Sequence, residues 1–225
     1  AHEFGHGIST RLAGGPNRTC LDNAEQMGEG WSDFFGLVVT AQPGDSGTTK
    51  RGVGNFVLKE QGTHKGIRRY PYSNDMNISP LTYADVASNQ ETHDLGEVWA
   101  NVLWDMYWAL SDAYGWSANP FDTSAGNYKA VRLIMDGLKN IACDPGFVDG
   151  RDAILAADAS LYQGVNACLL WEVFARRGLG YSADQGSAYD AGDQVAAFDI
   201  PPACTGQITI EKWVTGIIQP GEDIH

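Results

Sequence analysis

The sequence predicts a mainly α-helical globular protein, and three observations support this fold class. Apolar residues recur at steps of three and four along several segments, which is the spacing of one helix face. Stretches that contain Gly and Pro, which end helices, separate these segments. Of the 225 residues, 43% are hydrophobic and 19% are charged, which fits a folded core and argues against disorder.

We expect six helices. The first ends at a Gly-Gly-Pro stop signal, and the second ends before Pro43 and Gly44. The third is the longest and has a continuous apolar face, whereas the fourth and fifth have weaker patterns. The expected helices are residues 1–12, 23–40, 91–114, 128–141, 150–162 and 166–177.

Two regions lack this helical pattern. Residues 41–90 are rich in Gly, Pro, Ser, Asn and Asp, which predicts a long irregular region of the kind that carries substrate contacts, with a strand-like piece at 55–58. After two consecutive prolines, residues 207–214 alternate as a strand does. We therefore expect one domain at residues 1–202, followed at 203–225 by a linker and the first strand of a truncated β-domain.

The charge balance restricts the partners. The chain has 15 Lys and Arg against 28 Asp and Glu, a formal net charge of −13. Such an acidic chain repels phosphate backbones, so we expect no nucleic-acid partner. No apolar run approaches the roughly 20 residues that span a bilayer, so we expect no membrane span. The acidic surface fits a secreted protein, and it also fits an ordinary well-solvated surface.

The four cysteines are Cys20, Cys143, Cys168 and Cys204, and none forms a CxxC pair. A zinc site made of thiolates is therefore unsupported. Because Cys143 and Cys168 flank one predicted helix, we expect a disulfide between them in an oxidising compartment. Four buried free thiols are the alternative.

The first residues contain an HExxH motif, made by His2, Glu3 and His6. On a helix, positions i and i+4 are about 6 Å apart along the axis and roughly 40° apart around it. Both imidazoles therefore project from one face and can bind one zinc ion. Glu3 is expected beside the open coordination position, where it can accept a proton from bound water.

A second motif, Gly-Glu-Gly-Trp-Ser-Asp at residues 28–33, strengthens this prediction. Glu29 can supply the third ligand, and the resulting His₂Glu set with an open position is typical of catalytic zinc. Asp33 lies one turn further on, where it can accept the second N–H of a zinc-binding histidine. The alternative is a solvated helix face, but the surrounding helix is otherwise apolar and a buried carboxylate needs a partner.

At this point the sequence resembles the fungalysin family of secreted zinc metallopeptidases, which are thermolysin-like gluzincins. The resemblance extends from residue 1 to about residue 202, nearly 90% of the chain. It rests on five stretches: HEFGHGISTRLAGGP, MGEGWSDFF, GIRRYPYS, VDGRDAILAAD and WEVFARRGLG.

The resemblance implies a zinc-binding helix plus the α-helical C-lobe of a thermolysin-like metallopeptidase. The N-terminal β lobe of that fold is missing from this sequence, and the C-terminal residues look like the start of a β-sandwich domain. A signal sequence, a propeptide and the N-lobe are therefore expected upstream in a secreted, extracellular precursor. The isolated 225 residues are expected to be weakly active or inactive.

The resemblance also implies roles for individual residues. His2, His6 and Glu29 match the zinc ligands of the family, Glu3 matches its catalytic glutamate, and Asp33 matches the aspartate behind the zinc histidine.

The resemblance is less specific at three further residues. His93 resembles the histidine that stabilises the oxyanion, although a histidine there can also simply cap a helix. Arg68 or Arg69 resembles an arginine that holds a substrate carbonyl, with an ordinary surface basic pair as the alternative.

The implied function is zinc-dependent endoproteolysis of protein or peptide substrates, by zinc-activated water with a glutamate base. Calcium is possible in such an enzyme, but the sequence contains no DxDxDG-type loop to support it. Two other classes compete with this function: a zinc-stabilised structural or adhesive module, and a gluzincin hydrolase that is not a peptidase.

Overall fold

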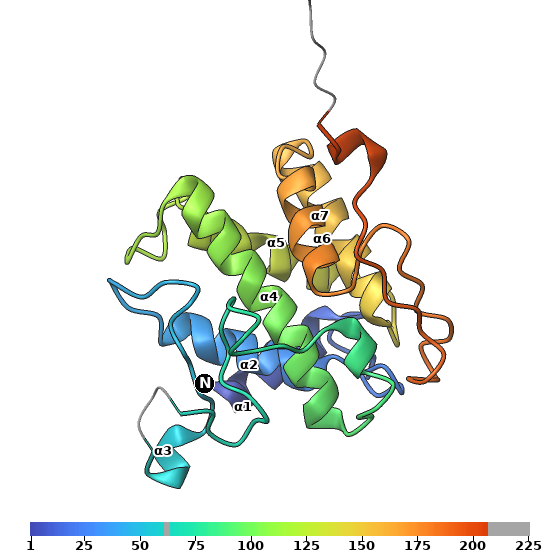
Figure 1. Cartoon of the computed structure of the whole chain (residues 1–225), viewed down its shortest axis with the longest axis horizontal. Coiled ribbons are helices and arrows are strands. Elements are labelled where there is room, and N and C mark those ends of the chain that lie inside the picture. Colours follow the sequence, from blue (N-terminus) through green and yellow to red (C-terminus); the bar gives the residue numbers. More distant parts are fainter. Residues whose placement is uncertain (61–63, 207–225) are drawn as a thin grey trace, which may run out of the picture.

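A computed structural model describes residues 1–60 and 64–206, and in this part of the chain it is mainly helical, as predicted (Figure 1). Strand pairing among the described residues is limited to isolated bridges. The elements are α1 (His2–Leu12), α2 (Gly28–Val39), α3 (Asn55–Leu58), η1 (Tyr83–Asp85), α4 (Thr92–Tyr114), α5 (Gly126–Asn140), α6 (Phe147–Tyr162), α7 (Ala167–Arg176) and η2 (Pro202–Cys204).

Helix α4 is the central element of the fold. It runs through the middle of the molecule, with α5, α6 and α7 on one side and α1 and α2 near its N-terminal half (Figure 1). It packs against α2, α5 and α7, while α1 packs against α2 and α5 packs against α6. Almost every side chain from Leu95 to Leu110 is buried. The core therefore surrounds α4, whose N-terminus is left at the edge.

All six expected helices are present, and the largest error in their bounds is at α2. It begins at Gly28, whereas the prediction began at residue 23. The residues before it make long-range contacts instead of a helical turn. Asn23 Nδ2 donates to the carbonyls of Pro145 and Ala188, and the carboxylate of Glu25 is fully buried.

The strand-like piece at 55–58 was predicted wrongly, because these residues form the short helix α3. Gly54 and Lys59, at its two ends, are both in the left-handed region, with φ of 76° and 59°. Phe56 and Val57 are exposed, so no packing against a neighbouring sheet holds this segment extended.

Glycines allow helices α1, α2 and α4 to approach one another closely. A Cβ atom on Gly5 of α1 would lie 2.6 Å from Ser32 Cα of α2. A Cβ atom on Gly30 of α2 would lie 2.5 Å from the carbonyl oxygen of Gly96 in α4. Only glycine fits at such contacts. These two crossings bring α1, α2 and the start of α4 to one place.

The disulfide expected between Cys143 and Cys168 is wrong. The pairs are Cys20–Cys143 and Cys168–Cys204, and no described cysteine is free. The 16-residue helix α6 lies between residues 143 and 168 and is about 24 Å long, so it separates the loop of Cys143 from Cys168, in the first turn of α7, too widely for a disulfide. The alternative of four free thiols is wrong as well.

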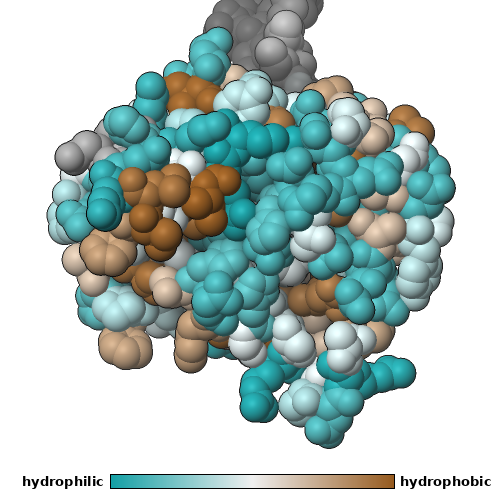
Figure 2. Space-filling model, turned by 90° about the horizontal axis from the view of Figure 1, so that it is seen from below, coloured by the Kyte–Doolittle hydropathy of each residue, from teal (hydrophilic) through white to brown (hydrophobic). Residues whose placement is uncertain are grey.

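The surface of the described residues is largely hydrophilic, but one face shows apolar side chains gathered into patches between hydrophilic ones (Figure 2). Large apolar side chains that are well exposed include Phe4, Phe56 and Phe121. No helix within residues 1–60 and 64–206 has both the length and the apolar character that crossing a bilayer would require. The strand expected at 207–214 lies outside the described residues.

Candidate metal centre and active site

Three predicted ligands, His2, His6 and Glu29, converge at the crossing of α1 and α2. His2 Nε2 lies 3.2 Å from His6 Nε2 and 3.2 Å from Glu29 Oε2, and His6 Nε2 lies 3.3 Å from Glu29 Oε1. In the described part of the chain, this is the one group of at least three such side chains whose ligand atoms are close enough to hold a metal ion.

The donor set fits zinc. Four ligands at 2.0–2.1 Å in a tetrahedron are about 3.4 Å apart, close to the separations observed here. His2 Nδ1 is 2.7 Å from Asp33 Oδ1, and because a carboxylate only accepts, Nδ1 carries a proton. In the neutral ring, Nε2 is then an acceptor that faces an acceptor oxygen of Glu29, and a cation between them resolves this conflict.

Asp33 contacts His2 at Nδ1, on the side of the ring away from the other two candidate ligands. Its hydrogen bond and its negative charge raise the pKa of His2, against the opposing effect of burial. Burial would raise the pKa of Asp33, but the hydrogen bonds from His2 and Arg68 outweigh it and lower this pKa. The carboxylate is therefore ionised and holds the ring in one orientation.

Two further side chains complete the surroundings of Asp33. The guanidinium of the buried Arg68 donates from Nε to Asp33 Oδ2 at 2.6 Å and from Nη2 to Oδ1 at 2.9 Å. The hydroxyl of Tyr72 also donates to Oδ2. Burial and the charge of Asp33 raise the pKa of Tyr72 well above its usual value, so the hydroxyl keeps its proton.

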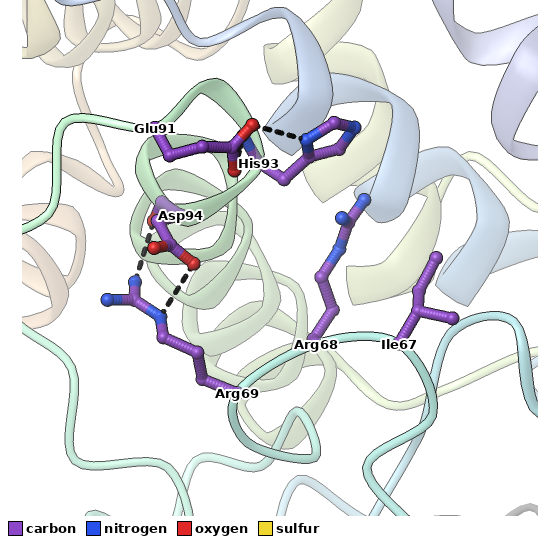
Figure 3. A pocket seen from close by; sticks show the side chains of 6 residues that line it. All are labelled: Ile67, Arg68, Arg69, Glu91, His93 and Asp94. Carbon is purple, nitrogen blue, oxygen red and sulfur yellow. Dashed lines mark hydrogen bonds and ion pairs between the residues drawn. The ribbon is translucent and has the colours of Figure 1, made fainter.

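Arg68 and Arg69 point in different directions from adjacent positions (Figure 3). Arg68 Nη2 also reaches Glu29 Oε2 at 3.3 Å, which places it beside the ligand cluster. Arg69 turns to α4, where it pairs with Asp94 and Glu97, both at 3.0 Å. Both arginines line a pocket of about 320 Å³ with Ile67, Glu91, His93 and Asp94.

Glu97 anchors the loop that carries the two arginines. This buried carboxylate on α4 accepts the backbone N–H of Tyr70 at 2.8 Å and that of Arg69 at 3.1 Å. Two main-chain groups next to Arg68 are thus fixed to α4, which sets the position from which Arg68 reaches Asp33.

His93 lies at the start of α4, facing the ligand cluster. Its Nε2 is 3.5 Å from Glu29 Oε2, and its Nδ1 is 2.7 Å from Glu91 Oε1. The other oxygen of Glu91 accepts the backbone N–H of His93, so Glu91 and not His93 caps this helix. The His93 side chain is 54% exposed, and its ring is open to the pocket.

The family model for fungalysin metallopeptidases (M36) matches residues 1–183. The chain belongs to this family. Among curated relatives of this fungalysin, Extracellular metalloproteinase 3 of Trichophyton tonsurans and that of Arthroderma benhamiae are each 42% identical over 212 residues. Extracellular metalloproteinase MEP of Neosartorya fischeri is 41% identical over 209 residues.

These alignments cover 89–90% of the fungalysin chain but 32% of each relative. The chain therefore spans about a third of the length of the curated relatives it matches. The resemblance stated from the motifs is confirmed, as is the mainly helical fold expected for the C-lobe of such a protein.

The remaining predicted residue of this fungalysin site, Glu3, lies exposed on α1 next to His2. Its carboxylate makes no hydrogen bond or ion pair with any residue in the described part of the chain. Sequence reasoning missed Tyr72, Glu91 and Glu97. Tyr72 lies in the GIRRYPYS stretch and Glu97 lies four residues after His93, so motif membership and helical spacing were the available signals.

Proposed function

We propose that this chain carries the catalytic centre of a secreted zinc metalloendopeptidase that hydrolyses peptide bonds in proteins. The observation that carries the proposal is the convergence of His2, His6 and Glu29, with Asp33 behind His2. Two imidazoles and one carboxylate with a position left over form the donor set of catalytic zinc. Zinc held there would polarise the scissile carbonyl and make a water acidic enough to attack it near neutral pH.

Glu3 is the proposed general base. Its position on α1 beside His2 and its exposure leave the carboxylate ready to take a proton from the attacking water. The same carboxylate then passes that proton to the leaving amine. A structural metal site has no use for such a free carboxylate, which argues against the structural or adhesive module.

His93 is the proposed donor to the oxyanion that develops on the scissile carbonyl. The carboxylate of Glu91 accepts from Nδ1, so Nε2, on the side where Glu29 lies, donates when the ring is an imidazolium that carries both protons. A hydrogen bond that forms only in the transition state is typically worth about 3–4 kcal/mol.

Arg68, rather than Arg69, is the proposed contact to a substrate carbonyl. Arg68 reaches Glu29 and lines the pocket, while Arg69 is held by Asp94 and Glu97 on α4. Arg69 then serves to hold the loop in place.

The extracellular setting is supported by the two disulfides and by the names of the relatives. Protein or peptide substrates follow from the peptidase family, against the reading as a different gluzincin hydrolase. We further propose that a propeptide and an N-lobe of the same precursor complete the cleft, and that the catalytic part ends near residue 202.

The test uses the full-length protein with Glu3→Gln, and with Glu172→Gln on the exposed face of α7 as the matched control. We expect Glu3→Gln to retain stoichiometric zinc and to lose nearly all cleavage of casein, while the control retains both. His2→Ala and Glu29→Ala should each lose the zinc by elemental analysis. Full caseinolysis by Glu3→Gln, or tight zinc in both ligand variants, would refute the assignment.

A further inference from the structure

We propose that Tyr72 is a positioning residue of the metal centre, whose buried hydroxyl fixes the Asp33 carboxylate and, through it, the ring of His2. This inference rests on the proposed function, because it concerns how the same centre holds its metal. Tyr72 does not touch the ligand atoms, so its effect must pass through Asp33.

Tyr72 is itself held firmly in place. Its side chain is fully buried, and its hydroxyl donates to Asp33 Oδ2. Its main chain pairs with Arg51 in both directions, with N to O distances of 2.7 and 3.0 Å. The hydroxyl therefore reaches Asp33 from a fixed position, as an anchor for an orienting carboxylate must.

Each oxygen of Asp33 has two donors. Oδ1 accepts from His2 Nδ1 at 2.7 Å and from Arg68 Nη2 at 2.9 Å. Oδ2 accepts from Arg68 Nε at 2.6 Å and from the Tyr72 hydroxyl. Because the residue is fully buried, water cannot replace a lost donor at low cost.

The donor from Tyr72 is what keeps Oδ1 available to His2. If the hydroxyl is removed, Oδ2 keeps only the donor from Arg68 Nε, and the carboxylate is free to rotate away from the position in which Oδ1 meets His2. The bond to His2 Nδ1 weakens, and the proton on this ring is then less firmly held at Nδ1. The lone pair on Nε2, which a metal requires, is correspondingly less available.

A second buried hydrogen bond from a tyrosine to a carboxylate lies elsewhere in the chain and provides a matched control. Tyr83 is also fully buried, and its hydroxyl donates to a buried carboxylate, Glu25 Oε1, at 2.8 Å. The other oxygen of Glu25 accepts the backbone N–H of Phe147, and no histidine is bonded to it in the described part of the chain. Tyr83→Phe therefore removes the same type of hydrogen bond at the same burial without touching a metal ligand.

The experiment compares Tyr72→Phe and Tyr83→Phe in the full-length protein. Zinc affinity is measured by competition with a chelator, kcat and KM on a peptide substrate, and stability by denaturant unfolding. We expect Tyr72→Phe to weaken zinc binding by about tenfold, as outer partners of metal histidines do, and to lower kcat with little change in KM. Tyr83→Phe should lose stability while zinc affinity and kcat stay within about twofold of wild type.

A double-mutant comparison supplies a second test that a merely structural role would not pass. In an Asp33→Ala background, Tyr72→Phe should have no further effect on zinc affinity, because its effect passes through the missing carboxylate. The inference is overturned if Tyr72→Phe alone leaves zinc affinity and kcat unchanged, or if it weakens zinc equally with and without Asp33. Zinc affinity is measured apart from proteolysis, so a wild-type protein that binds zinc but cleaves nothing would refute the proposed function and leave this comparison decisive.

Discussion

Two buried arginine–aspartate pairs occupy different regions of the molecule and serve it differently. In the region around the candidate ligands His2, His6 and Glu29, which we call the metal-proximal region, Arg68 binds Asp33 through Nε and Nη2. In the helical core, Arg177 binds Asp105 through the same two groups, at 2.7 and 3.0 Å. All four residues are at least 95% buried. The pairs are alike in geometry, so the difference between them lies in what else they contact.

The core pair is closed, in the sense that its other polar contacts are main-chain carbonyls and the neighbouring Arg176, whose Nη1 lies 3.6 Å from Asp105 Oδ2. The remaining donors of Arg177 go to the carbonyls of Ser79, Leu81 and Ser73, which ties the irregular chain before α4 to the end of α7. The metal-proximal pair is open, because Asp33 also holds His2, and Arg68 also reaches Glu29 and lines a pocket. The same type of ion pair thus joins parts of the fold in one place and contacts the candidate ligands His2 and Glu29 in the other.

The largest expected effect comes from breaking the core pair. Arg177→Met leaves the buried Asp105 carboxylate with only the longer ion pair to Arg176, at 3.6 Å, and it frees three carbonyls. We expect a loss of about 4 kcal/mol in the free energy of unfolding. Denaturant unfolding measures it. Zinc bound per folded molecule should stay at the wild-type value, and a stability loss below about 1 kcal/mol would contradict the description of this pair as closed.

The next effect concerns a buried carboxylate that has no arginine. Burial raises the pKa of Glu25 to about 7 from its usual value of 4.5, although the hydrogen bonds from Tyr83 and the Phe147 N–H lower it in part. Between these pH values the folded chain binds more protons than the unfolded chain, so the stability that this group contributes is complete below pH 4.5 and is lost as the pH rises through 7. The shift corresponds to about 3 kcal/mol.

Glu25→Gln, which cannot ionise, should therefore remove this component of the pH dependence. We would measure the free energy of unfolding at about pH 5 and about pH 8 for both proteins, because all other titrating groups are common to them. If the free energy of unfolding fell equally in both proteins between these two pH values, Glu25 would not titrate in this range.

Breaking the metal-proximal pair should lower stability less than breaking the core pair does, and it should lower activity more. In Arg68→Met, Asp33 keeps its hydrogen bonds from His2 and Tyr72, so we expect a loss of about 2 kcal/mol in the free energy of unfolding, half that of Arg177→Met. Peptide hydrolysis should fall by much more than the folded fraction does. If both arginine variants lost activity only in proportion to unfolding, the distinction between an open and a closed pair would be wrong.

The smallest effects test the helix crossing on which the metal-proximal region depends. Gly30→Ala forces a methyl group against the Gly96 carbonyl and should cost about 1–2 kcal/mol, with loss of zinc affinity. Gly36→Ala in the same helix meets nothing closer than 4.0 Å and should gain about 0.5–1 kcal/mol through helix propensity. Thermal unfolding checks this: Tm should fall in Gly30→Ala and rise in Gly36→Ala.

Local patterns explain what could be predicted from the sequence. The helices follow from apolar spacing, and HExxH is a motif of five residues, so α1, α4 and the candidate ligands required no knowledge of distant contacts. The structure brings His2, His6 and Glu29 together as that prediction required. The choice between Arg68 and Arg69 depends on α4, to which Glu97 and Asp94 bind only one of them.

Features that arise from distant contacts were not predictable. The partner of Cys143 depends on where α6 places its ends, and the late start of α2 depends on loops more than 120 residues away that accept hydrogen bonds from Asn23. Tyr72 looked like one aromatic residue in an irregular region, and its importance follows only from the burial of its hydroxyl against Asp33.

The Cys20–Cys143 disulfide has a consequence for the order in which the protein matures. The linker between the two ligand-bearing helices is joined to a residue 123 positions later, at the junction of α5 and α6. The three candidate ligands lie together within residues 2–29, but the cross-link beside them cannot form until Cys143 has been synthesised. The cross-link beside the candidate ligands can therefore form only after α4 and α5 have been synthesised, so this region is covalently secured later than its own residues are made.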